Sequence, residues 1–397
     1  MKRQGLIASK IPAANPKSKI QNLKSTPPRQ AEFESKLARI REYLRQRELG
    51  GVALGSQALF AWASAGGENY VSQASERGVA HLVVTPERVM VLTNNIEMQR
   101  LHAEEFKGID TQGMEFWACP WHAEDLAAEI GRRMHGNAWA CDLGLPGSQK
   151  LDEAFQALTY ALTPSEVARY RKLGQDCSEA MEEALSDIRP GCTEQAVAGA
   201  ICRRLWEHGV RPHVILVAAD ERVYGFRHPI PTGKKFRTHL MAVLCGKRGG
   251  LIVNLTRMLH RGRKLPDELR RKHEACCAID AALNGATRPG LPLNEVFAAG
   301  VAEYARQGFK DEWKLHHQGG PTGYHGRSFL GTPAETRRVC ENQAFAWNPS
   351  ITGTKSEDTM VAGREGFEFL SSPTGKWPAL TVQCGGRKLR RAAIRLL

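Results

Sequence analysis

Polar residues of the kinds that carry chemistry interrupt apolar stretches at four places in the second half of the chain. These places are residues 227–231, 253–257, 315–320 and 347–359. Imidazole titrates near neutral pH, and a neighbouring carboxylate fixes its tautomer. The histidines of these segments are therefore candidates for an acid–base set with Glu357, although an isolated histidine is more often a hydrogen-bonded structural residue. These histidines are His228, His316 and His317.

The order of the polar motifs resembles that of the creatinase/prolidase/aminopeptidase P superfamily. His228-Pro229-Ile230-Pro231 is similar to the HxxP motif, and Asn254-Leu255-Thr256-Arg257 is similar to Asp-x-Thr-Arg. His317-Gln318-Gly319-Gly320 is similar to His-x-x-Gly. Asn348-Pro349-Ser350 stands where the superfamily has Glu-Pro-Gly, and Glu357-Asp358-Thr359 stands where it has Glu-Asp-Thr. Each motif alone is weak, but five in the same order and at similar intervals indicate the fold.

The resemblance covers about residues 32–372 and implies an α+β fold. We expect a pita-bread domain of the catalytic type over residues 161–375. A smaller N-terminal α/β domain of the creatinase type is expected over residues 31–160. The resemblance also implies a homodimer, which the sequence does not show on its own.

Most of the metal ligands of the superfamily are missing from this chain. Its metallopeptidases hold two divalent cations with two aspartates, one histidine and two glutamates. Three of these positions fall on Val243, Asn254 and Asn348, which leaves only His317 and Glu357 as ordinary ligands. One carboxylate cannot neutralise two divalent cations, and a neutral amide bridges them poorly. We therefore expect no cofactor. A single divalent metal on His317, Glu357 and His316 stays open, because three protein ligands suffice for catalytic zinc.

The residues that remain suggest a metal-free acid–base mechanism. By resemblance, His228 is the main acid and base, and His317 is a second proton shuttle. Glu357 either orients the imidazoles or activates water. Creatinase is the precedent within this superfamily for hydrolysing a C–N bond without metal.

Seven further residues are candidates for substrate binding. They are His316, Arg257, Tyr324, Arg327, Asn254, Asn348 and Trp347. Because few carboxylates remain, the charges of Arg257, Arg327 and Lys355 favour an anionic substrate such as a carboxylate. Arg257 is equally suited to tying strands together. Buried aromatic residues such as Trp347 and Tyr324 more often belong to a core.

The elements that must position these residues follow from hydrophobic periodicity and capping signals. In the first domain a helical pattern begins at residue 31, and apolar runs at 80–84 and 89–92 flank a Pro-Glu-Arg turn. In the second domain Thr163-Pro164-Ser165-Glu166 is a capping box that opens a helix. Further helices are expected at about 194–208, 267–285 and 294–307, and strands at 214–218, 240–245 and 251–255. This order is typical of an α+β domain rather than of a parallel βαβ repeat.

The excess of positive charge lies at the two ends of the chain. The net charge is +13, and residues 1–30 and 376–397 together supply it with seven and six basic residues and no acid. We expect a disordered basic leader and a basic C-terminal tail. Specific nucleic-acid binding is not expected, because a folded reader carries its basic face on the domain itself.

Two further classes of protein are disfavoured by composition. No apolar run is long enough to span a membrane, so we do not expect a membrane protein. The ten cysteines contain no CxxC pair. This usage favours reduced thiols in a cytoplasmic protein.

Three functions fit these residues. The one we favour is a metal-independent hydrolase that cleaves a C–N bond in a small amide, guanidino or cyclic amidine compound. The second is an Xaa-Pro aminopeptidase or dipeptidase that acts on short peptides with an altered metal site. The third is a non-catalytic pita-bread protein that serves as a binding module.

Overall fold

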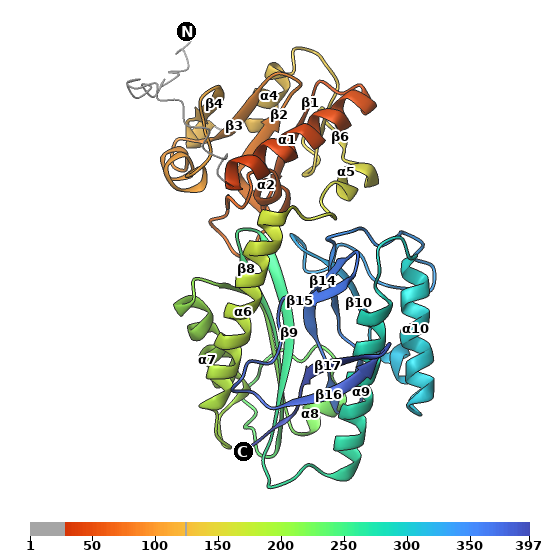
Figure 1. The fold of residues 1–397 in the computed structure, drawn as a ribbon. Coiled ribbons are helices and arrows are strands. Elements are labelled where there is room, and N and C mark those ends of the chain that lie inside the picture. The colour runs from red at the N-terminus through yellow and green to blue at the C-terminus, as the bar shows by residue number, and fades with distance from the viewer. Residues whose placement is uncertain (1–27, 124) are drawn as a thin grey trace, which may run out of the picture. The chain divides into compact units, whose positions relative to one another are not determined.

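The computed structural model describes residues 28–123 and 125–397 (Figure 1). The chain divides into two compact units between Thr159 and Tyr160, beside the boundary expected after residue 160. Most of the expected basic leader lies outside the described residues. Its last three residues, 28–30, are helical and belong to α1 (Pro28–Arg47). No helix in the described part of the chain is both long and apolar enough to cross a membrane.

The first unit is a six-stranded sheet covered by helices. The strand order is β4-β3-β2-β1-β5-β6. The strands are β1 (Gly51–Ser56), β2 (Arg77–Val84), β3 (Val89–Asn94), β4 (Met114–Cys119), β5 (Trp139–Cys141) and β6 (Gln149–Lys150). The helices after α1 are α2 (Gln57–Ala63), α3 (Met98–Arg100), α4 (Leu126–Arg133) and α5 (Glu153–Ala157), with a π-helical turn at Leu101–Glu105 and a 3₁₀ turn at Trp121–Ala123. The β2–β3 hairpin follows from the two apolar runs, with Val84 opposite Val89.

The second unit begins with the helix that the capping box predicts. The Thr163 hydroxyl accepts from the Glu166 amide, and the Glu166 carboxylate accepts from the Thr163 amide at 2.7 Å. The helices of this unit are α6 (Pro164–Ser186), α7 (Glu194–Glu207), α8 (Glu221–Gly225), α9 (Asp267–Ala286) and α10 (Leu293–Arg306), with a 3₁₀ turn at Glu312–Leu315. Figure 1 shows α6 along the long strands β8 and β9, and α7 packs on α6 and β7. Helix α9 lies beside the second sheet, and α10 packs on α9.

Two four-stranded sheets form the centre of the second unit. One has the order β18-β9-β8-β7 and the other β10-β11-β14-β15. Their strands are β7 (Arg211–Ala219), β8 (His239–Arg248), β9 (Leu251–His260), β10 (Gly319–Thr322), β11 (Ala344–Trp347), β14 (Asp358–Gly363), β15 (Gly366–Phe369) and β18 (Arg395–Leu396), and a short ladder pairs β12 (Ser350–Ile351) with β13 (Thr354–Lys355). The sheets meet where β9 touches the start of β14. There the Thr256 amide donates to the Glu357 carbonyl at 3.0 Å, and the Asn254 amide donates to the Thr359 hydroxyl at 2.8 Å.

Residues 376–397 are folded, so the prediction that this basic segment is a tail is wrong. Strands β16 (Ala379–Cys384) and β17 (Arg387–Ala392) form a hairpin, and β18 adds a parallel edge strand to β9. The sequence pattern misled because this segment is basic and free of acid. One of its arginines, Arg391, is completely buried and finds its acidic partners elsewhere in the chain.

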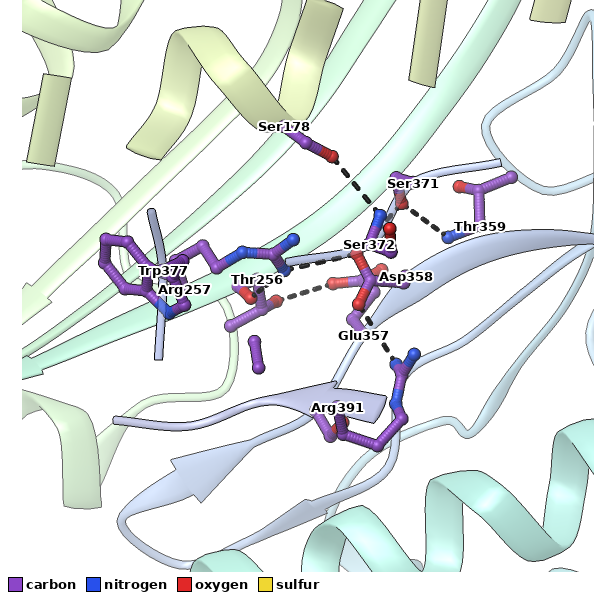
Figure 2. Close-up of polar contacts among 12 residues, drawn as sticks. Ser178, Thr256, Arg257, Glu357, Asp358, Thr359, Ser371, Ser372, Trp377 and Arg391 are labelled. Carbon is purple, nitrogen blue, oxygen red and sulfur yellow. Dashed lines mark hydrogen bonds and ion pairs between the residues drawn. The ribbon is translucent and has the colours of Figure 1, made fainter. Parts of the chain in front are cut away.

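A chain of buried ion pairs connects the hairpin to the junction of the two sheets (Figure 2). The Arg257 guanidinium on β9 binds Glu182 of α6 at 2.8 Å and Asp358 of β14 at 3.2 Å. Asp358 also binds Arg391 at 3.2 Å, and Arg391 binds Asp280 of α9. Removing one partner from such a pair leaves an uncompensated buried charge. These five residues therefore tie two helices and three strands together.

Arg391→Met is expected to destabilise the protein by about 3–5 kcal/mol, because it leaves the buried carboxylate of Asp280 without a cation and removes one of the two cations that bind Asp358. Arg390→Met is the matched control, since Arg390 is the exposed neighbour on the same strand. It should change stability by less than about 0.5 kcal/mol. Urea unfolding followed by tryptophan fluorescence measures both. Equal stability of the two variants would show that the ion-pair chain does not hold the hairpin.

Candidate active site

The three histidines predicted from the sequence lie together. His228 is exposed in the loop after α8, and His316 and His317 lie between the 3₁₀ turn and β10. The Nε2 atoms of His228 and His316 are 3.1 Å apart, so one ring donates its N–H to the other. The His316 ring stacks on that of His317, with ring centroids 4.4 Å apart. The ring centroids of His317 and His228 are 5.5 Å apart. The structure thus brings the three imidazoles into one cluster.

The predicted acid, Glu357, is a buried carboxylate held by three partners. Lys355 Nζ lies 2.9 Å from Oε2, and Arg327 donates to Oε1 at 2.9 Å. The Thr256 hydroxyl donates to Oε2 at 2.8 Å. Burial by itself raises the pKa of Glu357, but the charges of Lys355 and Arg327 outweigh burial and lower the pKa to about 2. Glu357 therefore remains ionised throughout the neutral range.

The same two cations help to keep the imidazoles neutral. Burial, followed by the charge of Lys355, lowers the pKa of His316 to about 2. Burial and the charges of Arg327 and Lys355 lower the pKa of His317 to about 4. Partial burial and Lys355 also lower the pKa of His228 below its ordinary value. The cluster therefore offers unprotonated ring nitrogens at neutral pH, a state in which imidazole acts as a base.

The positions that hold metal in the resembled superfamily do not fit a pair of divalent cations. Val243 packs in an apolar cluster, and it lies opposite Thr256 in the β8–β9 ladder. Asn254 and Asn348 are buried amides without charge. The one remaining carboxylate, Glu357, is already bound by two cationic side chains. This donor set offers too little negative charge for two metals.

A single cation has a different set of possible ligands. One nitrogen from each of His228, His316 and His317 lies within 4.8 Å of the other two. Three histidines are a known ligand set for zinc. The positive charges of Lys355 and Arg327 lower the pKa values of these histidines, and the same charges oppose a cation in the cluster.

Three of the predicted substrate-binding residues have their polar groups engaged elsewhere. The Arg257 guanidinium belongs to the buried ion-pair chain, which corresponds to the strand-tying role considered for it. Tyr324 donates its hydroxyl to Glu166 at 2.7 Å. The Trp347 ring is fully buried in the core formed with α9 and α10, and its N–H donates to Thr287 at 2.9 Å. Arg327, by contrast, lies at the site, where it binds the Glu357 carboxylate.

A glycine allows the second sheet to form close to the histidines. Gly319 has a φ of 93° and pairs with Trp347 of β11. A Cβ at this position would collide with the Ala346 carbonyl oxygen. The left-handed conformation and the close backbone approach both favour glycine, which gives a structural reason for the double glycine after His317.

Some site residues were not predicted as such from the sequence. Lys355 was considered only as a source of positive charge, yet it binds Glu357 directly. Thr256 anchors the same carboxylate, and Cys245 is the ladder partner of Asn254. Because side chains alternate along a strand, the spacing of Asn254 and Thr256 places both on one face. That alternation was the available signal for Thr256, whereas the position of Lys355 needed the tertiary fold.

Lys355→Met is expected to raise the pKa values of His316 and His317, because it removes a nearby positive charge that disfavours imidazolium. In the unaltered protein, ¹⁵N-imidazole NMR signals of both residues should show mainly neutral rings down to about pH 5. The variant should protonate at higher pH. Lys310→Met, at an exposed lysine, serves as the control and should leave both titrations unchanged. Identical titrations in the Lys355 variant would rule out its electrostatic role.

Comparison with known proteins gives one family match and several structural matches. The model of "Metallopeptidase family M24" matches residues 168–368. A curated relative, the "Agropine synthesis cyclase" of Rhizobium rhizogenes, is 26% identical over 289 residues, which cover 70% of this chain. The match spans 65% of the length of that relative.

Solved structures match over most of the chain. The Xaa-Pro dipeptidase from Bacillus anthracis has a TM-score of 0.72 at 17% identity, and the match covers 92% of this chain and 100% of that chain. The prolidase from Pyrococcus horikoshii has a TM-score of 0.72 at 15% identity, and the match covers 86% of this chain and 99% of that chain. At these identities the likeness is one of fold, and it confirms the predicted α+β pita-bread class.

Proposed function

The chain belongs to metallopeptidase family M24, and we propose that it is a metal-independent member that breaks a C–N bond in a small anionic compound by histidine acid–base catalysis. Membership of this family places the chain among peptidase-like hydrolases. The substrate classes that we propose are those favoured from the sequence: amides, guanidino compounds and cyclic amidines. The observation that carries the proposal is the contact of 3.1 Å between His228 and His316.

The histidine pair supports both halves of an acid–base cycle. Each ring is neutral at pH 7, so each has one N–H donor and one nitrogen with a lone pair that can accept a proton. A neutral imidazole of the pair accepts the proton of an attacking water as the new C–O bond forms. The resulting imidazolium returns that proton to the nitrogen as the C–N bond breaks, which yields a carbonyl product and an amine. We assign the exchange with substrate to His228, because it is the exposed member of the pair.

The remaining polar residues take supporting roles in this proposal. His316 receives or donates the internal hydrogen bond, and His317 stacks behind it as the second shuttle. Glu357 has a pKa of about 2, which makes it a weak base, and both of its oxygens are already bound, so we assign it the orienting role of the two considered for it. It holds Lys355 and Arg327 at the site, where their combined charge exceeds its own by one and favours an anionic group on the substrate.

The curated relative supports a second candidate, namely ring closure. Its name describes a cyclase, and ring closure by acyl transfer uses the same proton movements as hydrolysis. In that case a nucleophilic group of the substrate itself replaces water at the reacting carbon. Isotope labelling separates the two candidates, because only hydrolysis incorporates oxygen from ¹⁸O-labelled water into the product.

His228→Ala should lower turnover by about 10²–10⁴-fold, the usual contribution of a positioned acid–base group. The assay uses a panel of small amides, guanidino compounds and cyclic amidines that carry a carboxylate. His122→Ala is the control, because His122 is exposed in the first unit. Turnover by the His228 variant at the rate of the control would remove the proposed mechanism.

Elemental analysis of the purified protein tests metal independence. We expect less than one equivalent of manganese, cobalt, iron or zinc per chain, and turnover that survives dialysis against EDTA, because the donor set lacks three of the five ancestral ligands. Two equivalents per chain would instead support the Xaa-Pro peptidase alternative. One equivalent that EDTA removes together with activity would support the single-metal alternative.

A further inference from the structure

Two buried amides occupy positions that carry metal-binding acids in the resembled superfamily. Asn254 is fully buried on β9, and Asn348 is 3% exposed directly after β11. An amide keeps the size of a carboxylate but has no charge, and its oxygen accepts hydrogen bonds from neutral donors. The two amides therefore have the size of the metal-binding acids of the superfamily, but they bind neutral hydrogen-bond donors rather than cations.

The orientation of the Asn254 amide is fixed by its neighbour. The Thr322 hydroxyl has one proton, which it directs to the His325 carbonyl at 3.1 Å. It must therefore accept from Asn254, whose Nδ2 lies 3.1 Å away. Oδ1 consequently points away from Thr322. The Thr359 hydroxyl accepts from the Asn254 amide at 2.8 Å and donates to the Asn254 carbonyl at 3.0 Å, which fixes the backbone of Asn254.

Both amide oxygens are buried acceptors for which the described part of the chain provides no donor. This applies to Oδ1 of Asn254 and to Oδ1 of Asn348. Buried polar atoms in folded proteins nearly always have a partner, so each exception needs an explanation. Leaving an acceptor without a donor destabilises the folded state. Two such atoms at one site point to a ligand that supplies the donors.

The two amides lie around the same carboxylate. Asn254 shares a strand face with Thr256, whose hydroxyl binds Glu357. Trp347 pairs with Asp358, and the Ser356 amide donates to the Pro349 carbonyl at 3.2 Å. These two contacts bracket the next pair in the ladder, which is Asn348 opposite Glu357. Residues opposite each other in an antiparallel ladder share a face, so both amides face the site of Glu357.

We propose that Asn254 and Asn348 together bind uncharged O–H or N–H donors of the substrate, such as hydroxyl or primary amide groups. An ammonium group fits less well, because the charges of Lys355 and Arg327 exceed that of Glu357. This inference rests on the proposed function for its anionic substrate. It adds that the same molecule carries at least two neutral hydrogen-bond donors, held where the superfamily holds metal.

Ligand binding tests the inference without requiring turnover. The probes are two matched pairs of carboxylates without an ammonium group: gluconate against hexanoate for hydroxyl donors, and glutaramate against N,N-dimethylglutaramate for amide donors. Binding is measured by isothermal titration calorimetry on the full chain. We expect the donor-bearing member of at least one pair to bind more tightly than its partner. Equal binding within both pairs would overturn the proposal.

Variants of Asn254 and Asn348 then test whether these residues cause the preference for the donor-bearing probe. Asn254→Leu and Asn348→Leu should each weaken binding of the preferred probe about three- to tenfold, as expected for one lost hydrogen bond. They should leave binding of the donor-free partner unchanged. Asn294→Leu, at a half-buried asparagine of α10 outside the site, is the control. If a leucine variant fails to fold, the alanine variant at the same position replaces it. A preference that survives in the folded variants of both asparagines would overturn the assignment.

The outcomes separate this inference from the proposed function. If His228→Ala retains full turnover while the asparagine variants lose the donor preference, the mechanism fails and the binding subsite stands. If His228→Ala loses turnover while the preference survives both asparagine substitutions, the subsite fails and the mechanism stands.

Discussion

The site depends on one buried carboxylate that is surrounded by positive charge. Glu357 has no solvent to stabilise its charge, and Lys355, Arg327 and the hydroxyl of Thr256 take the place of solvent. A charge removed from water in this way is stable only with close and well-oriented partners. Burial lowers the pKa values of the neighbouring imidazoles, and the charges of the same cations lower them further. The interaction therefore fixes the acid, positions the two cations and adds to the effect of burial on the histidines.

A second layer of ion pairs supports this arrangement from the opposite face of the strand. Glu357 and Asp358 are adjacent, so their side chains point to opposite faces. Asp358 faces Arg257 and Arg391 (Figure 2). These two arginines in turn bind Glu182 and Asp280. Displacing the C-terminal hairpin would remove Arg391 from this layer. The stability of the site is thus coupled to a segment that contributes no residue to it.

The fold and the chemistry of this protein have separate origins. The pita-bread architecture matches that of prolidases over most of the chain, while three of the five positions that correspond to metal ligands in the resembled superfamily hold an apolar or neutral residue. A fold determines where side chains are placed, and the side chains determine the reaction. Here Glu357 and His317 stand at ligand positions of the resembled superfamily, and Val243, Asn254 and Asn348 stand where it has acids. Our proposal of an anionic, hydrogen-bonding substrate rests on this difference and on the charges of Lys355 and Arg327.

The sequence by itself determined the family resemblance, the α+β class, the capping box of α6 and the choice of Glu357 and three histidines as candidates, because these features are local patterns or ordered motifs. Only the tertiary structure decided which residues touch. His316 rather than His317 pairs with His228, Lys355 binds Glu357, and Trp347 lies in the core, because each of these outcomes depends on how distant strands align. The C-terminal segment shows the same limit: its basic composition resembles that of a tail, but the acids that neutralise Arg391 are far away in the sequence and adjacent only in the folded chain.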